Sequence, residues 1–366
     1  MLDRNRATAS PRGVIAGKRV LITGGTGSLG KVLLRRLLEG TAGHPDKIII
    51  FSRDEGKQHQ LRLDLQQIRS ATDEIVYQTA KSILEFRIGD IRDLDAVAAA
   101  LRGADIVFNA AALKQVPTCE YFPFEAVLTN ITGPQNIVRT IRNLELPVQT
   151  VVGISTDKAV NPVNVMGMTK ALQERIFMNA NRDIPATRFI LARYGNVLAS
   201  RGSVIPLFHE QIRGGGPVTI TDVNMTRFLL SLEDAVTVII TAVEEAQAGE
   251  TYIPIIPSAR IVDVATALID DRQIKTAVTG TRPGEKVHEV LISEEERHRT
   301  IKRGRHYVIE PILPELRREN VAREHLQREY SSADDVMPFE AVRELLVRQS
   351  LMVTTAPASH YGELLR

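Results

Sequence analysis

Short apolar segments and helix-like segments alternate regularly through the first half of the chain. Runs typical of buried strands occupy residues 19–23, 47–51, 84–88, 106–109, 150–154 and 189–193. Helical patterns between them cover 29–38, 57–69, 94–101, 124–143 and 170–179, and a loop is expected at 70–81. Because a strand, a crossover helix and the next strand form a parallel unit, this order predicts an α/β fold with a Rossmann-type doubly wound parallel sheet.

The second half predicts a smaller lobe. After Asn196 the alternation loosens, and Ser231 precedes an apolar helical pattern that runs to Val243. We expect a C-terminal substrate-binding lobe over the carboxyl edge of the sheet. The expected boundaries are a flexible N-terminal tail at 1–17, a dinucleotide-binding domain at 18–200, the lobe at 201–347 except for 228–255, which packs back on the domain, and a C-terminal tail at 348–366.

Composition and charge limit the class of protein. The 366 residues include 43% hydrophobic and 25% charged side chains, as in an ordinary globular protein. A net charge of +2 gives no overall attraction for nucleic acid or a membrane surface. Residues 1–12 lack an apolar signal segment, and no stretch is long enough to span a bilayer, so we expect a cytoplasmic protein. The single cysteine, Cys119, and the eight histidines show no spacing typical of a metal site.

A glycine-rich turn follows the first expected strand directly and precedes a helical pattern. Such a turn lets the backbone approach a pyrophosphate without a Cβ atom in the way, and it points a helix N-terminus at the negative charge. We therefore expect a dinucleotide cofactor to bind here. The residues concerned are Gly24, Thr26, Gly27, Ser28, Leu29 and Gly30.

The end of the second expected strand indicates which dinucleotide is bound. Ser52, Arg53 and Lys57 suit a 2′-phosphate, so NADP is favoured over NAD. The alternative is that Asp54 takes the ribose 2′-hydroxyl, as acidic residues do in NAD sites. Further cofactor contacts are expected after the third and fourth strands, beside the adenine at Asp90 and Ile91 and along the backbone at Ala110 and Ala111.

A run of polar residues follows the fifth expected strand, at the edge where open α/β sheets bind ligands. It reads Ser155-Thr156-Asp157-Lys158, and Lys170 comes at the start of the next helical pattern. The order of glycine-rich turn, Ser/Thr and Lys resembles the extended short-chain dehydrogenase/reductase superfamily. From about Lys18 to Val347, the strings SRDE, GDIRD, AALKQVP, STDKAVNP, RYGNVLASRGSVIP, ITDVNMTRF, SLEDAV and RPGEK resemble the inverting UDP-N-acetylglucosamine 4,6-dehydratases of bacterial surface-polysaccharide and flagellin-glycan pathways.

This resemblance implies a reaction and a role for each residue. The enzymes of the family make a UDP-4-keto-6-deoxy sugar: oxidation at C4 acidifies the C5 proton, a base removes it, an acid protonates the leaving 6-hydroxyl, and hydride returns at C6. Asp157 matches the acid and Lys158 the C5 base, Thr156 would hydrogen-bond the sugar 4-oxygen, and Lys170 would hold the nicotinamide ribose. For this role the pKa of Lys158 would have to fall through burial and the nearby Lys170 charge.

Met166 departs from the superfamily pattern Tyr-x-x-x-Lys. A thioether cannot accept the proton that the tyrosine takes from the sugar 4-hydroxyl. A subgroup of these dehydratases, from capsule and O-antigen pathways, also carries methionine there and is active, and the order Asn-x-Met-Gly-x-[Ser/Thr]-Lys resembles it. Either Lys158 acting twice or a water held by Thr156 would then remove the 4-hydroxyl proton.

The resemblance also implies a UDP-sugar site and a homo-oligomer, from dimer to hexamer. Asn196 matches a position near the sugar and diphosphate, arginines offer two-pronged phosphate contacts, Glu285 suits a ribose or uracil, and Lys114 could reach substrate or cofactor. The residues expected at the substrate are Lys114, Asn196, Arg201, Arg227, Arg282 and Glu285.

Two other functions compete with the dehydratase. A UDP-hexosamine 4-epimerase shares fold, cofactor and nucleotide, but it has no use for an acid at C6 and a base at C5, so the Asp157-Lys158 pair argues against it. A catalytically inactive, NADP-sensing relative is compatible with the missing tyrosine.

Overall fold

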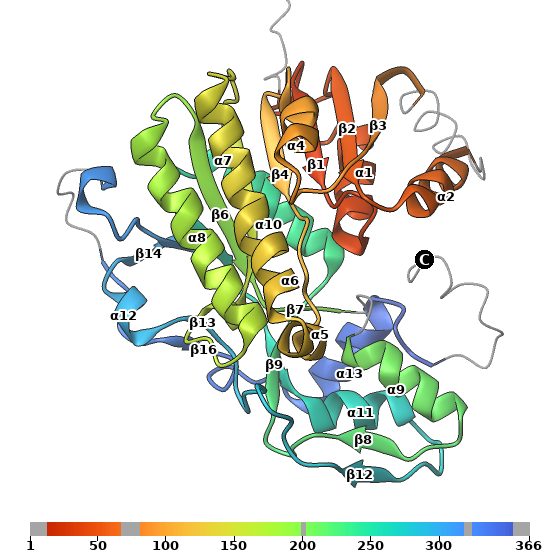
Figure 1. The fold of residues 1–366 in the computed structure, drawn as a ribbon. Coiled ribbons are helices and arrows are strands. Elements are labelled where there is room, and N and C mark those ends of the chain that lie inside the picture. The colour runs from red at the N-terminus through yellow and green to blue at the C-terminus, as the bar shows by residue number, and fades with distance from the viewer. Residues whose placement is uncertain (1–12, 67–80, 199–202, 318–323, 354–366) are drawn as a thin grey trace, which may run out of the picture.

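The computed structural model describes residues 13–66, 81–198, 203–317 and 324–353. Its central feature is a nine-stranded sheet with the order β14-β15-β10-β6-β5-β4-β1-β2-β3 (Figure 1). Neighbouring strands from β3 to β10 are parallel, whereas β15 pairs antiparallel with β10 and β14 pairs antiparallel with β15. The expected α/β fold with a Rossmann-type sheet is therefore confirmed.

The expected strands of the first half are all present, with ends that differ by no more than two residues. The strands of the large sheet are β1 (Arg19–Thr23), β2 (Lys47–Ser52), β3 (Leu84–Ile88), β4 (Ile106–Asn109), β5 (Thr150–Thr156), β6 (Arg188–Tyr194), β10 (Thr251–Pro254), β14 (Thr300–Arg303) and β15 (His306–Ile309). The helices that cover it include α1 (Ser28–Glu39), α2 (Glu55–Gln66), α4 (Leu94–Leu101), α7 (Gly133–Asn143), α8 (Val165–Asp183) and α10 (Leu232–Glu245).

Both faces of this sheet are covered by helices, and Figure 1 shows α7 and α8 side by side over one of them. On one face Ile22 of β1 packs in a cluster with Leu33 of α1 and Ile239 of α10. On the other face the adjacent Leu21 belongs to a cluster with Ile141 of α7. Because successive side chains of a strand point to opposite faces, a strand buried on both sides reads as an unbroken apolar run, which is why the sequence pattern identified these strands.

The smaller lobe has its own apolar core, in which Phe208, Val264 and Leu346 are buried. Its helices are α9 (Val204–Arg213), α11 (Ile261–Ile269) and α13 (Phe339–Arg348). Its short strands are β7 (Asn196–Val197), β8 (Val218–Ile220), β9 (Thr226–Leu230), β11 (Ser258–Arg260), β12 (Thr276–Val278), β13 (Val290–Ile292) and β16 (Tyr330–Ser331). Because β7 directly follows β6 and pairs with β9, the lobe lies at the carboxyl ends of the main strands (Figure 1).

Two expected helices have different limits in the structure. The helix expected at 124–143 is divided into α6 (Pro123–Val127), a π-helical turn (Leu128–Thr132) and α7, and α5 (Val116–Tyr121) precedes it. Pro123 and Pro134 lie in first turns, where a missing N–H is tolerated. The helix expected at 170–179 begins at Val165 as α8, because the Asn164 side chain accepts a 2.8 Å hydrogen bond from the Gly167 N–H and caps it.

The second helix expected along the chain, at 57–69, begins at Glu55 as α2, and residues 67–69 lie outside the described residues. So does most of the loop expected at 70–81, of which only Lys81 is described, in a helical turn at 81–83. No helix in the described ranges is long and apolar enough to cross a membrane.

The packing differs from the expected division of the chain at three places. Ile15, expected in the N-terminal tail, is fully buried in the main core, and its N–H donates to the Ala42 carbonyl. Strands β14 and β15, expected in the lobe, extend the large sheet because β15 pairs with β10. Leu351 and Val353, expected in the C-terminal tail, are buried in the core of the lobe.

A buried ionic network joins β6, α8 and α12 (Glu294–Arg297). The guanidinium of Arg193, in β6, lies 2.6 Å from Glu174 of α8 and 2.7 Å from Glu296 of α12. Ser155 donates to the same Glu174 carboxylate at 2.5 Å. Burial alone would raise the pKa of Glu296, but the Arg193 charge and its hydrogen bonds outweigh burial and lower that pKa to about 2. The network fixes the end of β5 against its neighbours.

We expect Arg193→Met to lower the free energy of unfolding by about 3–5 kcal/mol, because two buried carboxylates would lose their common partner. Urea unfolding at neutral pH measures this loss. Arg36→Met is the matched control, since Arg36 pairs with Glu233 at 2.6 Å on the surface, where a pair contributes about 0–1 kcal/mol. Equal small losses in both variants would contradict a stabilising role of the buried network.

Candidate active site

The glycine-rich turn connects β1 to α1. Gly24 has a φ of +66°, in the left-handed region, and a Cβ atom there would lie 2.8 Å from the backbone of Ala111. Gly30 lies so close to Gly25 that a Cβ atom would come within 2.5 Å of the Gly25 carbonyl oxygen. Within the described chain no side chain caps the N-terminus of α1. The turn therefore fits a pyrophosphate, because the backbone can approach it and N–H groups point toward it.

The loop after β4 is tied to this turn. Thr23, the last residue of β1, donates to the Asn109 side chain at 2.8 Å and accepts from the Ala111 N–H at 3.2 Å. The Ala110 N–H donates to the Thr23 carbonyl at 3.2 Å. These bonds hold Ala110 and Ala111 beside the glycine turn.

At the end of β2, the expected cofactor residues have separate partners. Ser52 is buried and accepts from the Gln58 amide, and Lys57 pairs with Asp54 at 2.6 Å. The Arg53 side chain is 59% exposed, and its guanidinium is 3.7 Å from the Asp90 carboxylate.

Asp90, after β3, is also bonded by Arg92 at 2.7 Å, and Arg92 in turn reaches Glu125 at 2.6 Å. Burial raises the pKa of Asp90, but the hydrogen bonds and charge of Arg92 outweigh burial and hold that pKa below its ordinary value. Ile91 is buried against the core under α4 and α7. Asp90 is therefore a fixed anion beside Arg53.

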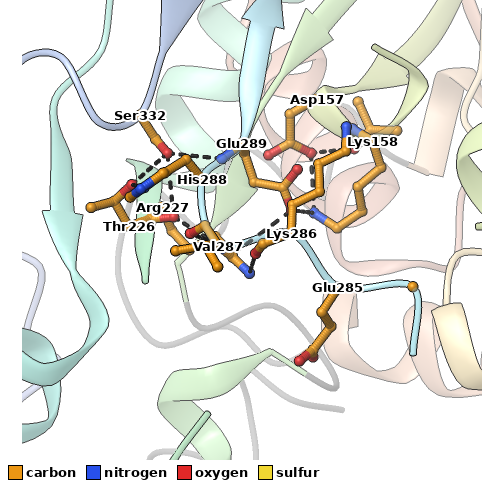
Figure 2. Close-up of polar contacts among 12 residues, drawn as sticks. Asp157, Lys158, Thr226, Arg227, Glu285, Lys286, Val287, His288, Glu289 and Ser332 are labelled. Carbon is orange, nitrogen blue, oxygen red and sulfur yellow. Dashed lines mark hydrogen bonds and ion pairs between the residues drawn. The ribbon is translucent and has the colours of Figure 1, made fainter. Parts of the chain in front are cut away.

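Asp157 and Lys158 form the turn η2 (Asp157–Ala159) at the end of β5. Asp157 is fully buried, and its Oδ1 accepts from the Thr156 hydroxyl at 2.8 Å and from the Lys158 ammonium at 3.1 Å. Among the described residues its Oδ2 has no hydrogen-bond partner. The Lys158 ammonium also lies 3.4 Å from Oε1 of Glu289 (Figure 2). One ammonium thus lies between two buried carboxylates.

The role of C5 base led us to expect a lowered pKa for Lys158, and this expectation is wrong. Burial favours the neutral amine, but the charges of Asp157 and Glu289 outweigh burial and hold the pKa of Lys158 above its ordinary value. The lysine whose pKa falls is Lys170, to about 8, because burial outweighs the charge of Glu174. The Lys170 ammonium donates to the Ile154 carbonyl at 2.5 Å and to Gln173 at 2.7 Å. The two lysines therefore differ because only Lys158 lies between two carboxylates.

Met166 is 4% exposed and packs in a small apolar cluster with Cys119 and Ala126. Burial raises the pKa of the Cys119 thiol to about 11, so this thiol is not a reactive thiolate. The position that carries tyrosine in the superfamily pattern is therefore apolar here. In the part of the chain that the structure describes, no group of three or more His, Cys, Asp or Glu could hold a metal ion.

The expected substrate residues do not all lie together. Arg227 is 7% exposed, and its terminal nitrogens donate to the carbonyls of Thr226, Lys286 and Val287, so its guanidinium braces the loop before β13 instead of lying open to a phosphate. Figure 2 shows Glu285 lying apart from the carboxylate cluster. Arg282 and Glu285 close one turn, in which the Arg282 N–H donates to the Glu285 carboxylate at 3.3 Å.

Asn196 begins β7, and its buried Oδ1 has no hydrogen-bond partner in the described ranges. Its position next to Gly195 places it near Asp157, because a Cβ atom on Gly195 would lie 3.4 Å from Asp157 Oδ2. Lys114 is exposed in the loop after β4, and Arg201 lies outside the described residues.

Glu289 was missed by the sequence reasoning. It comes four residues after Glu285, directly before the apolar run Val290-Leu291-Ile292, and it is 3% exposed. A carboxylate beside a short apolar strand was the available signal. Only the pairing of β13 with β16 and the approach of η2 bring it to Lys158.

Comparison with known proteins identifies similar sequences. The pattern of the polysaccharide biosynthesis protein family matches residues 20–311. A UDP-N-acetylglucosamine 4,6-dehydratase (inverting) from Campylobacter jejuni is 42% identical over 306 residues, which are 83% of this chain and 86% of that protein. A UDP-glucose 4-epimerase from Rickettsia canadensis is 44% identical over 298 residues, 80% of this chain and 82% of that protein.

Solved structures share the fold. The X-ray structure of Pen from Bacillus thuringiensis matches with a TM-score of 0.81 and 34% identity, over 92% of this chain and 99% of that one. The dTDP-glucose 4,6-dehydratase DesIV from Streptomyces venezuelae, solved with NAD and TYD bound, has a TM-score of 0.63 and 22% identity, over 74% of this chain and 86% of that one.

We expect Gly24→Ala to destabilise the protein by about 1–2 kcal/mol from its left-handed backbone alone, and further because the new methyl group would collide with Ala111. Gly56→Ala is the control, since a Cβ atom there meets only Asp54 at 3.5 Å, and it should leave stability unchanged or raise it by up to about 1 kcal/mol. Urea unfolding compares the two. A Gly24→Ala protein as stable as Gly56→Ala would show that the turn does not need glycine.

Proposed function

Because this chain belongs to the polysaccharide biosynthesis protein family, we propose that it is a UDP-N-acetylglucosamine 4,6-dehydratase that inverts C5 and makes a UDP-4-keto-6-deoxy sugar for bacterial surface-glycan or related deoxyaminosugar biosynthesis. The observation that carries the proposal is the buried contact of 3.1 Å between the Lys158 ammonium and Asp157, at the end of β5. This contact joins a potential base and a potential acid at the edge where α/β sheets bind ligands.

Overall similarity does not separate a dehydratase from an epimerase, because relatives with these names are 42% and 44% identical to this chain. The chemistry of the site favours the dehydratase. Dehydration removes a proton from C5 and protonates the hydroxyl that leaves C6, so it needs both a base and an acid. Epimerisation at C4 leaves C5 and C6 unchanged, so an epimerase does not need a base at C5 or an acid at C6.

In this proposal Asp157 protonates the leaving 6-hydroxyl and Lys158 takes the C5 proton. Among the described residues Oδ2 of Asp157 has no hydrogen-bond partner, which leaves this side of the carboxyl group available to a ligand, whereas Oδ1 accepts from Thr156. Lys158 then returns a proton to the opposite face of C5, which inverts that centre. The Lys158 side chain is 22% exposed, so its amine can exchange protons with water between these steps.

Thr156 supplies a route for the 4-hydroxyl proton that does not need Met166. Its hydroxyl donates to Asp157 at 2.8 Å, so its oxygen is left to accept from the sugar 4-hydroxyl. A proton can pass from the sugar to Thr156 while the Thr156 proton passes to Asp157. Asp157 then holds the proton that it gives to the 6-hydroxyl, and the protons balance. A water between the sugar and Thr156 would lengthen the same route.

We also propose that the chain binds a nicotinamide dinucleotide on the turn from Gly24 to Gly30, with Lys170 beside the nicotinamide ribose. A bound nicotinamide would supply the hydride acceptor for oxidation at C4 and the hydride donor for reduction at C6. The protein's part is to hold the dinucleotide: the turn approaches the pyrophosphate, and Ala111 keeps the loop after β4 clear of bulky side chains. NAD in the DesIV structure supports this assignment at the level of the fold.

NADP is the proposed form because of the charges at the end of β2. The Arg53 guanidinium is largely exposed, so two of its nitrogens can donate hydrogen bonds to a 2′-phosphate. Asp54, the alternative ribose partner, is engaged by Lys57 at 2.6 Å. Of the six residues expected at the substrate, we propose as UDP-sugar contacts Asn196, whose buried Oδ1 has no partner among the described residues, and the exposed Arg282 and Lys114.

A UDP-sugar 4-epimerase is the second candidate, because a relative of that name is as similar as the dehydratase. An inactive, NADP-sensing protein is the third, because Met166 cannot act as a base. Turnover of UDP-N-acetylglucosamine separates all three.

The reaction run in heavy water tests the function directly. We expect proton NMR to show a product with a new C6 methyl signal and deuterium at C5, because Lys158 exchanges its protons with solvent before it returns one to C5. An epimerase product would keep its 6-hydroxyl and a protiated C5, and the absence of any product would favour the sensing protein.

The variants Lys158→Ala and Asp157→Asn belong in the same assay. Each should slow turnover by about 10²-fold or more, the usual effect of removing a general base or acid. Met166→Ala is their control and should keep measurable turnover, since the thioether only packs against Cys119 and Ala126. Full activity of Lys158→Ala would refute its role as the C5 base.

Arg53→Ala tests the choice between NADP and NAD. We expect it to weaken NADP binding at least about 10-fold more than NAD binding in a fluorescence titration, because only NADP offers a phosphate to the guanidinium. Arg182→Ala is the control, as Arg182 is similarly exposed and pairs with Glu315 at 3.1 Å. Equal losses for both dinucleotides would overturn the NADP assignment.

A further inference from the structure

Glu289 is a buried carboxylate to which the proposed reaction has so far given no part. It lies directly before β13, and its backbone is held by Ser332 through hydrogen bonds of 2.9 Å from the Glu289 N–H and 2.8 Å to the Glu289 carbonyl. The side chain is 4% exposed and points toward the Lys158 ammonium (Figure 2). The carboxylate is therefore aimed at the proposed base from a second element.

Charged groups reach Glu289 from three elements. From η2, the Lys158 ammonium lies 3.4 Å from Oε1 and is shared with Asp157 at 3.1 Å. From β9, the Arg227 Nε lies 3.8 Å from the same oxygen. From its own loop, the charge of Lys286 acts to lower the pKa of Glu289, and His288 is its neighbour in the chain. Oε2 of Glu289 has no hydrogen-bond partner within the described ranges.

The other basic side chains near Glu289 have hydrogen-bond partners of their own. The Lys286 ammonium donates to the Val160 carbonyl at 2.5 Å, and the His288 ring bonds the Thr226 hydroxyl at 2.8 Å. The two ends of the Arg227 guanidinium donate to backbone carbonyls. Lys158 is thus the group whose proton Glu289 is best placed to receive.

We propose that Glu289 is the positioning residue that accepts the Lys158 ammonium proton and so produces the neutral amine that takes the C5 proton. This inference rests on the proposed dehydratase function. In the step, one Nζ–H bond of Lys158 breaks and its electron pair stays on nitrogen, while a lone pair of Glu289 Oε1 forms an O–H bond. The charged pair becomes a neutral pair, with no proton taken from solvent.

Burial makes this transfer feasible. Burial raises the pKa of Glu289 above its ordinary value in spite of the Lys158 charge, whereas the neighbouring carboxylates keep Lys158 protonated at rest. Once Asp157 carries the proton of the 4-hydroxyl, its negative charge no longer holds the ammonium. Lys158 can then release its proton to Glu289 as the acid on Asp157 becomes ready.

Glu289→Gln tests the proposal, because the amide keeps the shape and an acceptor oxygen but cannot take the proton. We expect kcat at pH 7 to fall about 10²-fold or more with little change in KM, and then to rise about tenfold per pH unit toward alkaline pH, as bulk solvent deprotonates Lys158. Lys158→Ala should show no such recovery. A Glu289→Gln enzyme with the wild-type pH profile would overturn the proposal.

Two further variants separate this role from a structural one. Glu289→Asp keeps a proton acceptor, so it should retain the wild-type pH profile and more activity than Glu289→Gln. Glu250→Gln is the matched control, since Glu250, directly before β10, is also buried and pairs with Arg303 at 2.9 Å, and the pH profile of this variant should not change. An alkaline shift in Glu250→Gln as large as in Glu289→Gln would overturn the proposal.

A measurement on the unliganded wild-type protein does not depend on turnover. Carbon NMR of the Glu289 carboxyl should show a pKa above the ordinary value of about 4.3. A pKa at or below that value would overturn the proposal, because the carboxylate would be too weak a base. If the wild-type protein makes no dehydrated product, the proposed function fails, and the carboxyl titration still decides whether Glu289 can hold the proton.

Discussion

The parallel pairing of β1, β4, β5 and β6 determines where the functional groups of this protein lie. Their register places Thr23 opposite Asn109, Asn109 opposite Gly153, and Thr156 opposite Tyr194, so the strands end at one common edge. The glycine turn follows the first of these strands and the acid–base turn follows the third. A cofactor cradle and a proton-transfer group therefore lie at the same edge of the sheet, on either side of β4, although more than 120 residues separate them in the sequence.

Two buried ionic clusters near this edge differ in how fully they are paired. In the first, Arg193 lies between Glu174 and Glu296, and its nitrogens bond both carboxylates. In the second, Lys158 lies between Asp157 and Glu289, and each carboxylate keeps one oxygen without a partner in the described residues. Buried polar groups are usually satisfied, so the fully paired cluster suits a structural role and the incompletely paired one suits chemistry.

Met166 stands where the superfamily pattern has tyrosine, so another residue must remove the proton of the sugar 4-hydroxyl. The position lies among Cys119 and Ala126, an apolar environment that would not favour a charged phenolate. The proposed proton route instead uses Thr156 and Asp157, which are already hydrogen-bonded to each other. In that arrangement the residues of one turn and one neighbouring carboxylate carry all the protons. The proposed dehydratase reaction therefore does not need a tyrosine at position 166.

The Rossmann-type sheet, the glycine turn and the Asp157-Lys158 pair follow from the amino-acid sequence alone, because apolar periodicity and the local order of residues along the chain carry that information. The contact of Glu289 with Lys158, the role of Arg227 in bracing a loop, and the extension of the sheet by β14 and β15 become visible only in the folded chain. Lys158 and Lys170 looked alike in the sequence, and their opposite pKa shifts arise from which buried charges surround each ammonium. Such contacts join residues far apart in the chain, and no local pattern encodes them.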